Sequence, residues 1–114
     1  DIDRKNYSMP YAKPVFELLR NVNSPNIKML YDIYHQNMMG DFDIDEVKEN
    51  IDLIGHFHVA DSPGRHEPGT GNVDYVNILK EIGKTDYNGY IGLEYRATKN
   101  DGETFGFLKE ADLL

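Results

Sequence analysis

The chain has 114 residues, of which 39% are hydrophobic and 11% aromatic, a composition typical of a folded region and not of a disordered chain. Its net charge of −8 argues against nucleic acid as a partner, because such a surface repels phosphate groups. The absence of cysteine excludes disulfides and thiolate metal sites, and no apolar run approaches the roughly 20 residues that cross a bilayer, so we expect a cytoplasmic protein that does not enter a membrane.

Helical and strand-like patterns of apolar residues alternate along the chain. Apolar residues recur at helical spacing in four segments, which are residues 9–22, 43–54, 73–82 and 101–114. Asp43 has the side chain of a helix N-cap at the start of the second segment. Short apolar runs predict three strands, at residues 27–34, 54–60 and 90–95. A loop rich in glycine and proline occupies residues 61–72.

This alternation of helices and strands predicts an α/β fold with a parallel sheet. We expect about three parallel strands and four helices, all within a single region that covers residues 1–114. Right-handed crossovers would place the C-terminal ends of all three strands at one edge of the sheet. That edge carries the chemistry in open α/β sheets and in (β/α)8 barrels.

Ionisable residues stand at the end of each predicted strand. Because side chains alternate along a strand, three sets of residues each share a face: Leu30, Asp32 and Tyr34; His56, His58 and Ala60; Gly92, Glu94 and Arg96. If these faces point into a barrel, Asp32, His58 and Glu94 converge at its mouth. Two carboxylates and an imidazole suit Mn²⁺, Mg²⁺ or Co²⁺, and Zn²⁺ is a further candidate.

Each of these residues also has a structural interpretation. Asp32 is as well suited to cap a helix or to lie in a loop, and His58 taken alone is explained better as a core histidine. Glu94 is harder to explain in this way, because a glutamate inside a strand needs a partner, and Arg96 is one candidate. His56 is interpreted as a structural histidine. Arg65, in the loop of residues 61–72, is either a solvated charge or a forked donor to a substrate oxygen. The residues alone therefore predict a metal site or a carboxylate-rich active site.

Four motifs together resemble the xylose-isomerase-like superfamily of sugar isomerases and epimerases, most closely its hydroxypyruvate isomerase branch. They are Tyr-Asp-Ile-Tyr-His at residues 31–35, Gly-His-Phe-His-Val-Ala-Asp at 55–61, Pro-Gly-Thr-Gly at 68–71 and Gly-Leu-Glu at 92–94. The loop Pro-Gly-Arg-His-Glu at 63–67 favours that branch over the ketose 3-epimerases. The resemblance covers nearly the whole chain.

The resemblance implies a metal-dependent isomerase of small α-hydroxy carbonyl compounds, which reacts through an enediolate. Asp32, His58 and Glu94 match the family's metal ligands, and Glu94 is also its catalytic base. His35 and Arg65 match residues that bind substrate. A fourth ligand, a glutamate, is expected upstream of Asp1. The chain is thus expected to form the C-terminal half of a (β/α)8 barrel, with the N-terminal half absent.

Three alternatives remain at this level. The first is a ketose 3-epimerase or a related sugar-phosphate isomerase, and the second is a metal-dependent endonuclease, against which the acidic charge and the few histidines argue. The third is a catalytically inactive fragment, because half a barrel leaves an open sheet edge. The expected partner is a small sugar or hydroxy-keto acid, and the sequence leaves room for a homo-oligomer.

Overall fold

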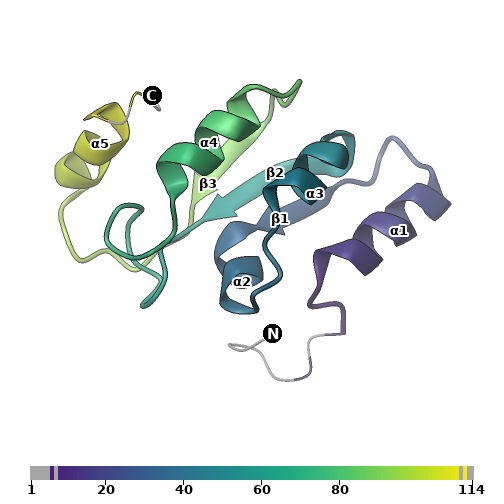
Figure 1. Ribbon diagram of the computed structural model, residues 1–114, viewed down its shortest axis with the longest axis horizontal. Coiled ribbons are helices and arrows are strands. Elements are labelled where there is room, and N and C mark those ends of the chain that lie inside the picture. Colours follow the sequence, from purple (N-terminus) through teal and green to yellow (C-terminus); the bar gives the residue numbers. More distant parts are fainter. Residues whose placement is uncertain (1–5, 7, 111, 113–114) are drawn as a thin grey trace.

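The computed structural model describes residues 6, 8–110 and 112, and in this range helices and strands alternate (Figure 1). The strands are β1 (Met29–Asp32), β2 (Ile54–Val59) and β3 (Tyr90–Leu93). The helices are α1 (Ala12–Val22), α2 (Ile33–Met38), α3 (Ile44–Glu49), α4 (Tyr75–Gly83) and α5 (Asp101–Glu110), with a short 3₁₀ turn, η1 (Ile51–Leu53), after α3. None of the helices in the described range has the length and apolar character needed to cross a membrane.

The three strands form one parallel sheet in the order β1-β2-β3. Asp32 is the register partner of His58, which in turn pairs with Gly92. The backbone N–H of Glu94 donates to the carbonyl of Val59 at 3.0 Å, so the pairing of β2 and β3 continues one residue past β3. The parallel sheet and the α/β class predicted from the sequence are confirmed, with all three C-terminal strand ends at one edge.

The prediction for the first strand is wrong at its C-terminal end. The strand ends at Asp32, and Ile33 and Tyr34 begin α2, a helix that the sequence analysis did not predict. The side chain of Asp32 accepts a hydrogen bond from the backbone N–H of His35 at 3.1 Å and thereby caps this helix. Tyr34 therefore does not share a strand face with Leu30, and the described residues form five α-helices where four were expected.

Other boundaries differ by a few residues. The helix predicted for residues 43–54 is capped by Asp43 as expected, but it ends at Glu49, because η1 intervenes before Ile54 begins β2. The first helix begins at Ala12, after the proline at position 10. Residues 111, 113 and 114 of the predicted last helix lie outside the described residues, and α5 ends at Glu110.

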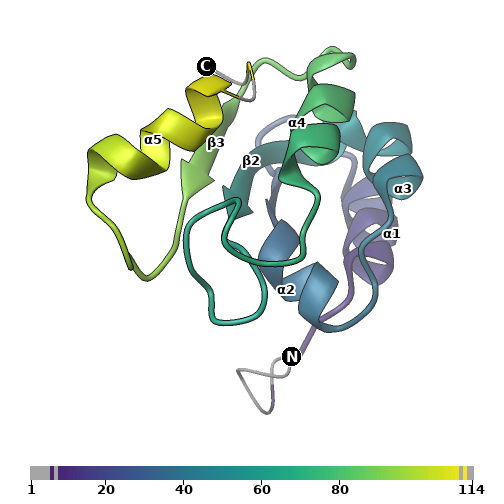
Figure 2. The ribbon, with the colours of Figure 1, turned by 60° about the vertical axis from the view of Figure 1, so that its left-hand side comes forward.

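The core lies between one face of the sheet and the helices α1, α3 and α4, which run along that face (Figures 1 and 2). The sheet contributes Tyr31, Phe57 and Val59, which have no exposed surface. The helices contribute Ala12, Phe16, Val47, Tyr75, Ile78 and Ile82. The ring of Tyr31 is a neighbour of the rings of Phe16, Phe42 and Phe57. This helix-covered face is called the outer face below.

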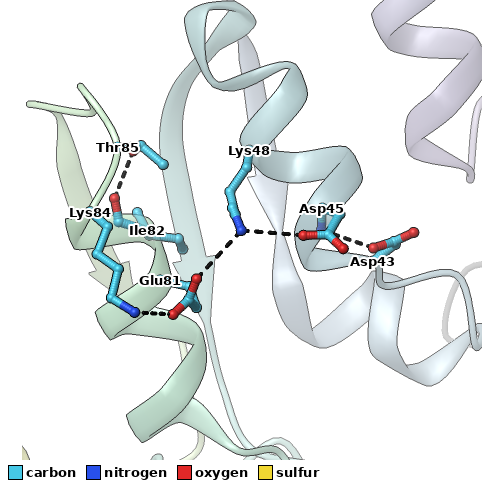
Figure 3. Close-up of polar contacts among 7 residues, drawn as sticks. All are labelled: Asp43, Asp45, Lys48, Glu81, Ile82, Lys84 and Thr85. Carbon is cyan, nitrogen blue, oxygen red and sulfur yellow. Dashed lines mark hydrogen bonds and ion pairs between the residues drawn. The ribbon is translucent and has the colours of Figure 1, made fainter.

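Ion pairs join two of these helices at the surface. Lys48 of α3 lies 3.2 Å from the carboxylate of Asp45 and 3.4 Å from that of Glu81 on α4, and Glu81 also pairs with Lys84 (Figure 3). Exposed pairs of this kind contribute roughly 0–1 kcal/mol each. The pair of Lys48 and Glu81 connects α3 to α4, whereas the other two pairs join residues of one helix or its C-terminal end.

Candidate active site

Three ionisable side chains from the three strand ends meet at the C-terminal edge of the sheet. Asp32 is the last residue of β1, His58 lies near the end of β2, and Glu94 immediately follows β3. One ligand atom from each lies within 4.8 Å of the other two. The structure therefore brings together the three residues that the sequence analysis placed at a barrel mouth.

The geometry of this triad fits a divalent cation. Nδ1 of His58 lies 3.6 Å from Oε2 of Glu94, which is longer than a hydrogen bond, so these two groups face each other without a direct bond. The side chains of Asp32, His58 and Glu94 are 16%, 26% and 51% exposed. Two carboxylates and one imidazole, partly shielded from water, form a donor set suited to Mn²⁺, Mg²⁺, Co²⁺ or Zn²⁺.

The two carboxylate oxygens of Asp32 face two different groups of the same residue, His35. One oxygen caps α2 through the N–H of His35, as described above. The other lies 3.7 Å from Nε2 of the same histidine. The capping interpretation of Asp32 is correct, and it does not compete with a place in the triad. The cap fixes the orientation of the carboxylate and also brings His35 beside it.

The partner of Glu94 is Arg65, and not Arg96 as one interpretation of the sequence held. The guanidinium of Arg65 forms an ion pair with Oε2 of Glu94, and its Cζ lies 5.3 Å from the centre of the Tyr34 ring, within the range of a cation–π contact. Arg65 has a φ of 60°, which is rare for a residue other than glycine and favours a specific local role. Arg65 is therefore not a solvated loop charge.

A cavity of about 530 Å³ opens over these side chains, a size suited to a small molecule. Its lining includes all five residues that the sequence analysis singled out, namely Asp32, His35, His58, Arg65 and Glu94. Gln36 also lines it, and the sequence analysis missed this residue. The Gln36 side chain is buried, donates to the carbonyl of Pro10 at 2.9 Å and accepts from the N–H of Ala12 at 3.2 Å, so it fixes the segment that forms one wall.

His56 lies on the same face as His58, with their rings 5.0 Å apart and nearly perpendicular. It is not part of the group of converging ligand atoms found among the described residues. Gly92 makes room for both rings. A Cβ atom at Gly92 would lie 2.8 Å from Nε2 of His56 and 3.1 Å from Cδ2 of His58. The close approach of two side chains is thus the physical reason for glycine here, and the sequence alone does not signal it.

Buried polar contacts hold the loop after β2. The Asp61 side chain is fully buried and accepts hydrogen bonds from the N–H groups of Ser62, Gly69 and Val73 at 2.8, 2.8 and 3.1 Å. The hydroxyl of Tyr75 donates to the carbonyl of Ala60 at 2.6 Å, and burial raises the pKa of this tyrosine. Hydrogen bonds therefore hold the loop that carries Arg65, both at the end of β2 and between the loop's own residues.

Comparison with known proteins gives a consistent family. The model of the xylose isomerase-like TIM barrel family matches residues 5–112. Hydroxypyruvate isomerase of Escherichia coli (strain K12) is 36% identical over 94 residues, which are 82% of this chain. The 2-oxo-tetronate isomerase of Pectobacterium atrosepticum is 32% identical over 102 residues, or 87% of this chain.

A solved structure of an AP endonuclease of family 2 from Brucella melitensis aligns with a TM-score of 0.77 at 25% identity, over 89% of this chain and 39% of that one. A 3-keto-D-glucoside 4-epimerase from Escherichia coli aligns with a TM-score of 0.80 over 92% of this chain and 41% of its own, and its 23% identity supports the fold alone. The chain spans 36% and 38% of the lengths of the two isomerases, so it corresponds to well under half of these relatives.

Proposed function

The chain belongs to the xylose isomerase-like TIM barrel family, and from this premise we propose that it forms the metal-binding edge of an isomerase of small α-hydroxy carbonyl compounds, of the hydroxypyruvate isomerase type. The observation that carries the proposal is the convergence of Asp32, His58 and Glu94 within 4.8 Å at the ends of three adjacent parallel strands. Relatives named as isomerases support the reaction class.

In this proposal Asp32, His58 and Glu94 hold the cation. A divalent cation bound there would supply a Lewis acid, which polarises a carbonyl group and favours negative charge on its oxygen. Capping of α2 engages one oxygen of Asp32, and the other oxygen, 3.7 Å from Nε2 of His35, is the one that we assign to the cation. No thiolate competes for the ion, because the chain contains no cysteine.

Proton transfer is assigned to Glu94. Its carboxylate removes the proton from the hydroxyl-bearing carbon next to the substrate carbonyl and returns it to the carbonyl carbon. The hydroxyl proton passes to the former carbonyl oxygen, which completes the isomerisation through an enediolate. The ion pair with Arg65 places a forked cation beside this carboxylate, in reach of substrate oxygens. His35, held beside Asp32 by the first turn of α2, is the second group proposed to bind substrate oxygens.

The activity is proposed for a complete barrel. Within the described residues β1 and β3 each pair on one side only, and a closed (β/α)8 barrel has eight strands in about 250 residues. We accordingly propose that residues 1–114 form the C-terminal part of such a barrel and that a further glutamate elsewhere in the protein completes the ligand set. By itself this segment should not turn over substrate.

The test is a comparison of substrates and metals with the full-length protein. After removal of bound metal with a chelator, Mn²⁺, Mg²⁺, Co²⁺ and Zn²⁺ are returned singly and turnover is measured on hydroxypyruvate and on ketoses. Activity on hydroxypyruvate that returns with metal supports the isomerase, whereas turnover of ketoses alone favours the 3-epimerase. Activity that survives the chelator undiminished contradicts the metal-dependent mechanism.

The role of Glu94 is tested in the same assay. Glu94→Gln keeps the size of the side chain but removes the base and weakens a ligand, so turnover should fall by at least about 10³-fold while the circular dichroism spectrum is retained. Glu103→Gln, an equal change at an exposed position of α5, is the matched control and should leave turnover unchanged. Wild-type turnover of Glu94→Gln would remove Glu94 from the mechanism.

A further inference from the structure

Glu67 is a buried carboxylate that connects two distant segments of the chain. It lies in the loop after β2, and the residue is 1% exposed. Its Oε1 accepts hydrogen bonds from the backbone N–H groups of Thr98 and Lys99 at 2.6 and 2.7 Å. Its Oε2 accepts from the hydroxyl of Thr98 at 2.8 Å. Thr98 and Lys99 follow β3, and they lie 31 and 32 residues further along the chain.

These bonds keep the carboxylate ionised in spite of its burial. Burial alone would raise the pKa of Glu67, but hydrogen bonds from its own backbone N–H and from Thr98 and Lys99 outweigh it and lower the pKa to about 2. A carboxylate that accepts from three donors on another segment is a rigid attachment point, because each oxygen has at least one fixed partner. Glu67 is thus a fixed connection between the loop and the segment after β3.

The connection lies next to the pair of Arg65 and Glu94. Arg65 is two residues before Glu67, and its carbonyl accepts a hydrogen bond from the N–H of Arg96 at 2.7 Å. The ring of His66 donates from Nδ1 to the carbonyl of Arg96 at 2.9 Å. Arg96 is itself two residues after Glu94. The three successive loop residues 65–67 are therefore joined to the segment that carries Glu94.

We propose that Glu67 is a positioning residue, which holds the loop against the segment after β3 and so keeps the guanidinium of Arg65 at Glu94. The contrast with Asp61 supports this assignment. The Asp61 side chain is equally buried, but the bonds to its carboxylate come from residues 62, 69 and 73 of its own loop and its immediate C-terminal flank. Asp61 therefore fixes the shape of the loop, whereas Glu67 fixes its place relative to Glu94. The functional consequence of this placement rests on the proposed isomerase activity.

The first test measures the position of Arg65 without reference to activity. In the full-length protein with ¹⁵N-labelled arginine, the Nη2–H protons of Arg65 should exchange slowly with water, because Nη2 is the atom that pairs with Glu94. Glu67→Gln and Thr98→Val should each accelerate this exchange at least about 10-fold, since each removes part of the connection. Thr70→Val is the matched control, because the Thr70 hydroxyl bonds the carbonyl of residue 67 and not its carboxylate.

The outcomes of this test are distinct. Thr98→Val alters a single hydroxyl and keeps both backbone donors, so it serves as the test if Glu67→Gln does not fold. Unchanged exchange of Arg65 in a folded Glu67→Gln or Thr98→Val protein would overturn the proposal. Equal acceleration by Thr70→Val would overturn it too, because the effect would then belong to the loop in general.

The second test is a double-mutant cycle on turnover. Glu67→Gln should lower kcat/KM by about 10- to 100-fold, and it should have almost no further effect in an Arg65→Ala background, because it acts through Arg65. Additive losses would indicate a general structural role and contradict the proposal. If Arg65→Ala itself leaves turnover unchanged, the proposed function of Arg65 fails, and the exchange measurement still decides whether Glu67 positions it.

Discussion

The two faces of the three-stranded sheet differ in burial and in chemistry, although successive residues of each strand point to one face and then to the other. On the outer face Tyr31, Phe57 and Val59 have no exposed surface and pack against three helices. On the opposite face, called the inner face here, Leu30 is 50% and Tyr90 is 84% exposed, and Asp32 and His58 reach the cavity. One face is closed by the chain's own helices, and the other is open to ligands.

Residues that stabilise the fold and residues of the candidate site are therefore direct neighbours along a strand. Phe57 and His58 are neighbours in β2, but Phe57 belongs to the core and His58 to the triad. Because successive side chains point to opposite faces, a substitution at one position should leave the role of the next largely intact. The predictions below test how complete that separation is, beginning with the largest expected effect.

Removal of an outer-face ring should affect folding and little else. Phe57 packs edge-on against Tyr31 and Tyr87, with ring centres 5.8 and 4.9 Å apart. Phe57→Ala should lower the free energy of unfolding of the full-length protein by about 3–5 kcal/mol, because it leaves a cavity in the core. Urea unfolding measures this loss. His58→Ala, one residue along, is the control, and in metal-free protein it should cost less than about 1.5 kcal/mol.

A large loss of stability from His58→Ala, or loss of metal affinity from a folded Phe57→Ala protein, would show that the two faces are coupled. Either result would contradict the separation, because residues of one face would then contribute to the stability or the metal affinity that is assigned to the other face. The metal affinity is measured by titration calorimetry with Mn²⁺, so this control does not depend on knowing the substrate.

Much of this arrangement is predictable from the sequence, because its signals are local. Asp32, His58 and Glu94 each lie near the end of an apolar run that indicates a strand, and helix–strand alternation indicates a parallel sheet that gathers them. Helix α2 is not predictable in the same way. Its residues Ile33 and Tyr34 continue an apolar run, and only the folded backbone shows that the Asp32 carboxylate reaches the N–H of His35 and starts a helix.

Contacts between distant segments account for the other omissions. The Gln36 side chain bonds to residues 10 and 12, and the Glu67 carboxylate bonds to residues 98 and 99, so these contacts cannot be read from neighbouring positions in the sequence. For the same reason, the sequence does not show that the partner of Glu94 is Arg65 and not Arg96. Arg96 is closer in sequence, but the loop after β2 brings Arg65 to the carboxylate.

Gly92 offers a sharper test of the inner face. Its missing side chain leaves room for the rings of His56 and His58, and Gly92→Ala would place a Cβ atom 2.8 and 3.1 Å from them. The histidine rings must then move, so we expect the Mn²⁺ affinity of the full-length protein to fall by about 10-fold, as misplaced ligands weaken metal sites. Unfolding in urea should change little, since the outer face is untouched. Unchanged Mn²⁺ affinity would show that His58 tolerates displacement or is not a ligand.

Glu67 refines the comparison, because it is as buried as the outer-face residues but charged. Its pKa of about 2 lies below the ordinary value of 4.5, so the unfolded chain binds more protons between these values and stability must rise with pH there. The contribution of Glu67 is complete above about pH 4.5 and is lost as the pH falls toward 2. Glu67→Gln should therefore lower the melting temperature at pH 7 by several degrees and by much less near pH 2. If the melting temperature falls equally at pH 7 and near pH 2, the ionised carboxylate does not join the loop to the segment after β3. Burial of the Glu67 side chain would then stabilise the protein in the same way as burial of the outer-face side chains.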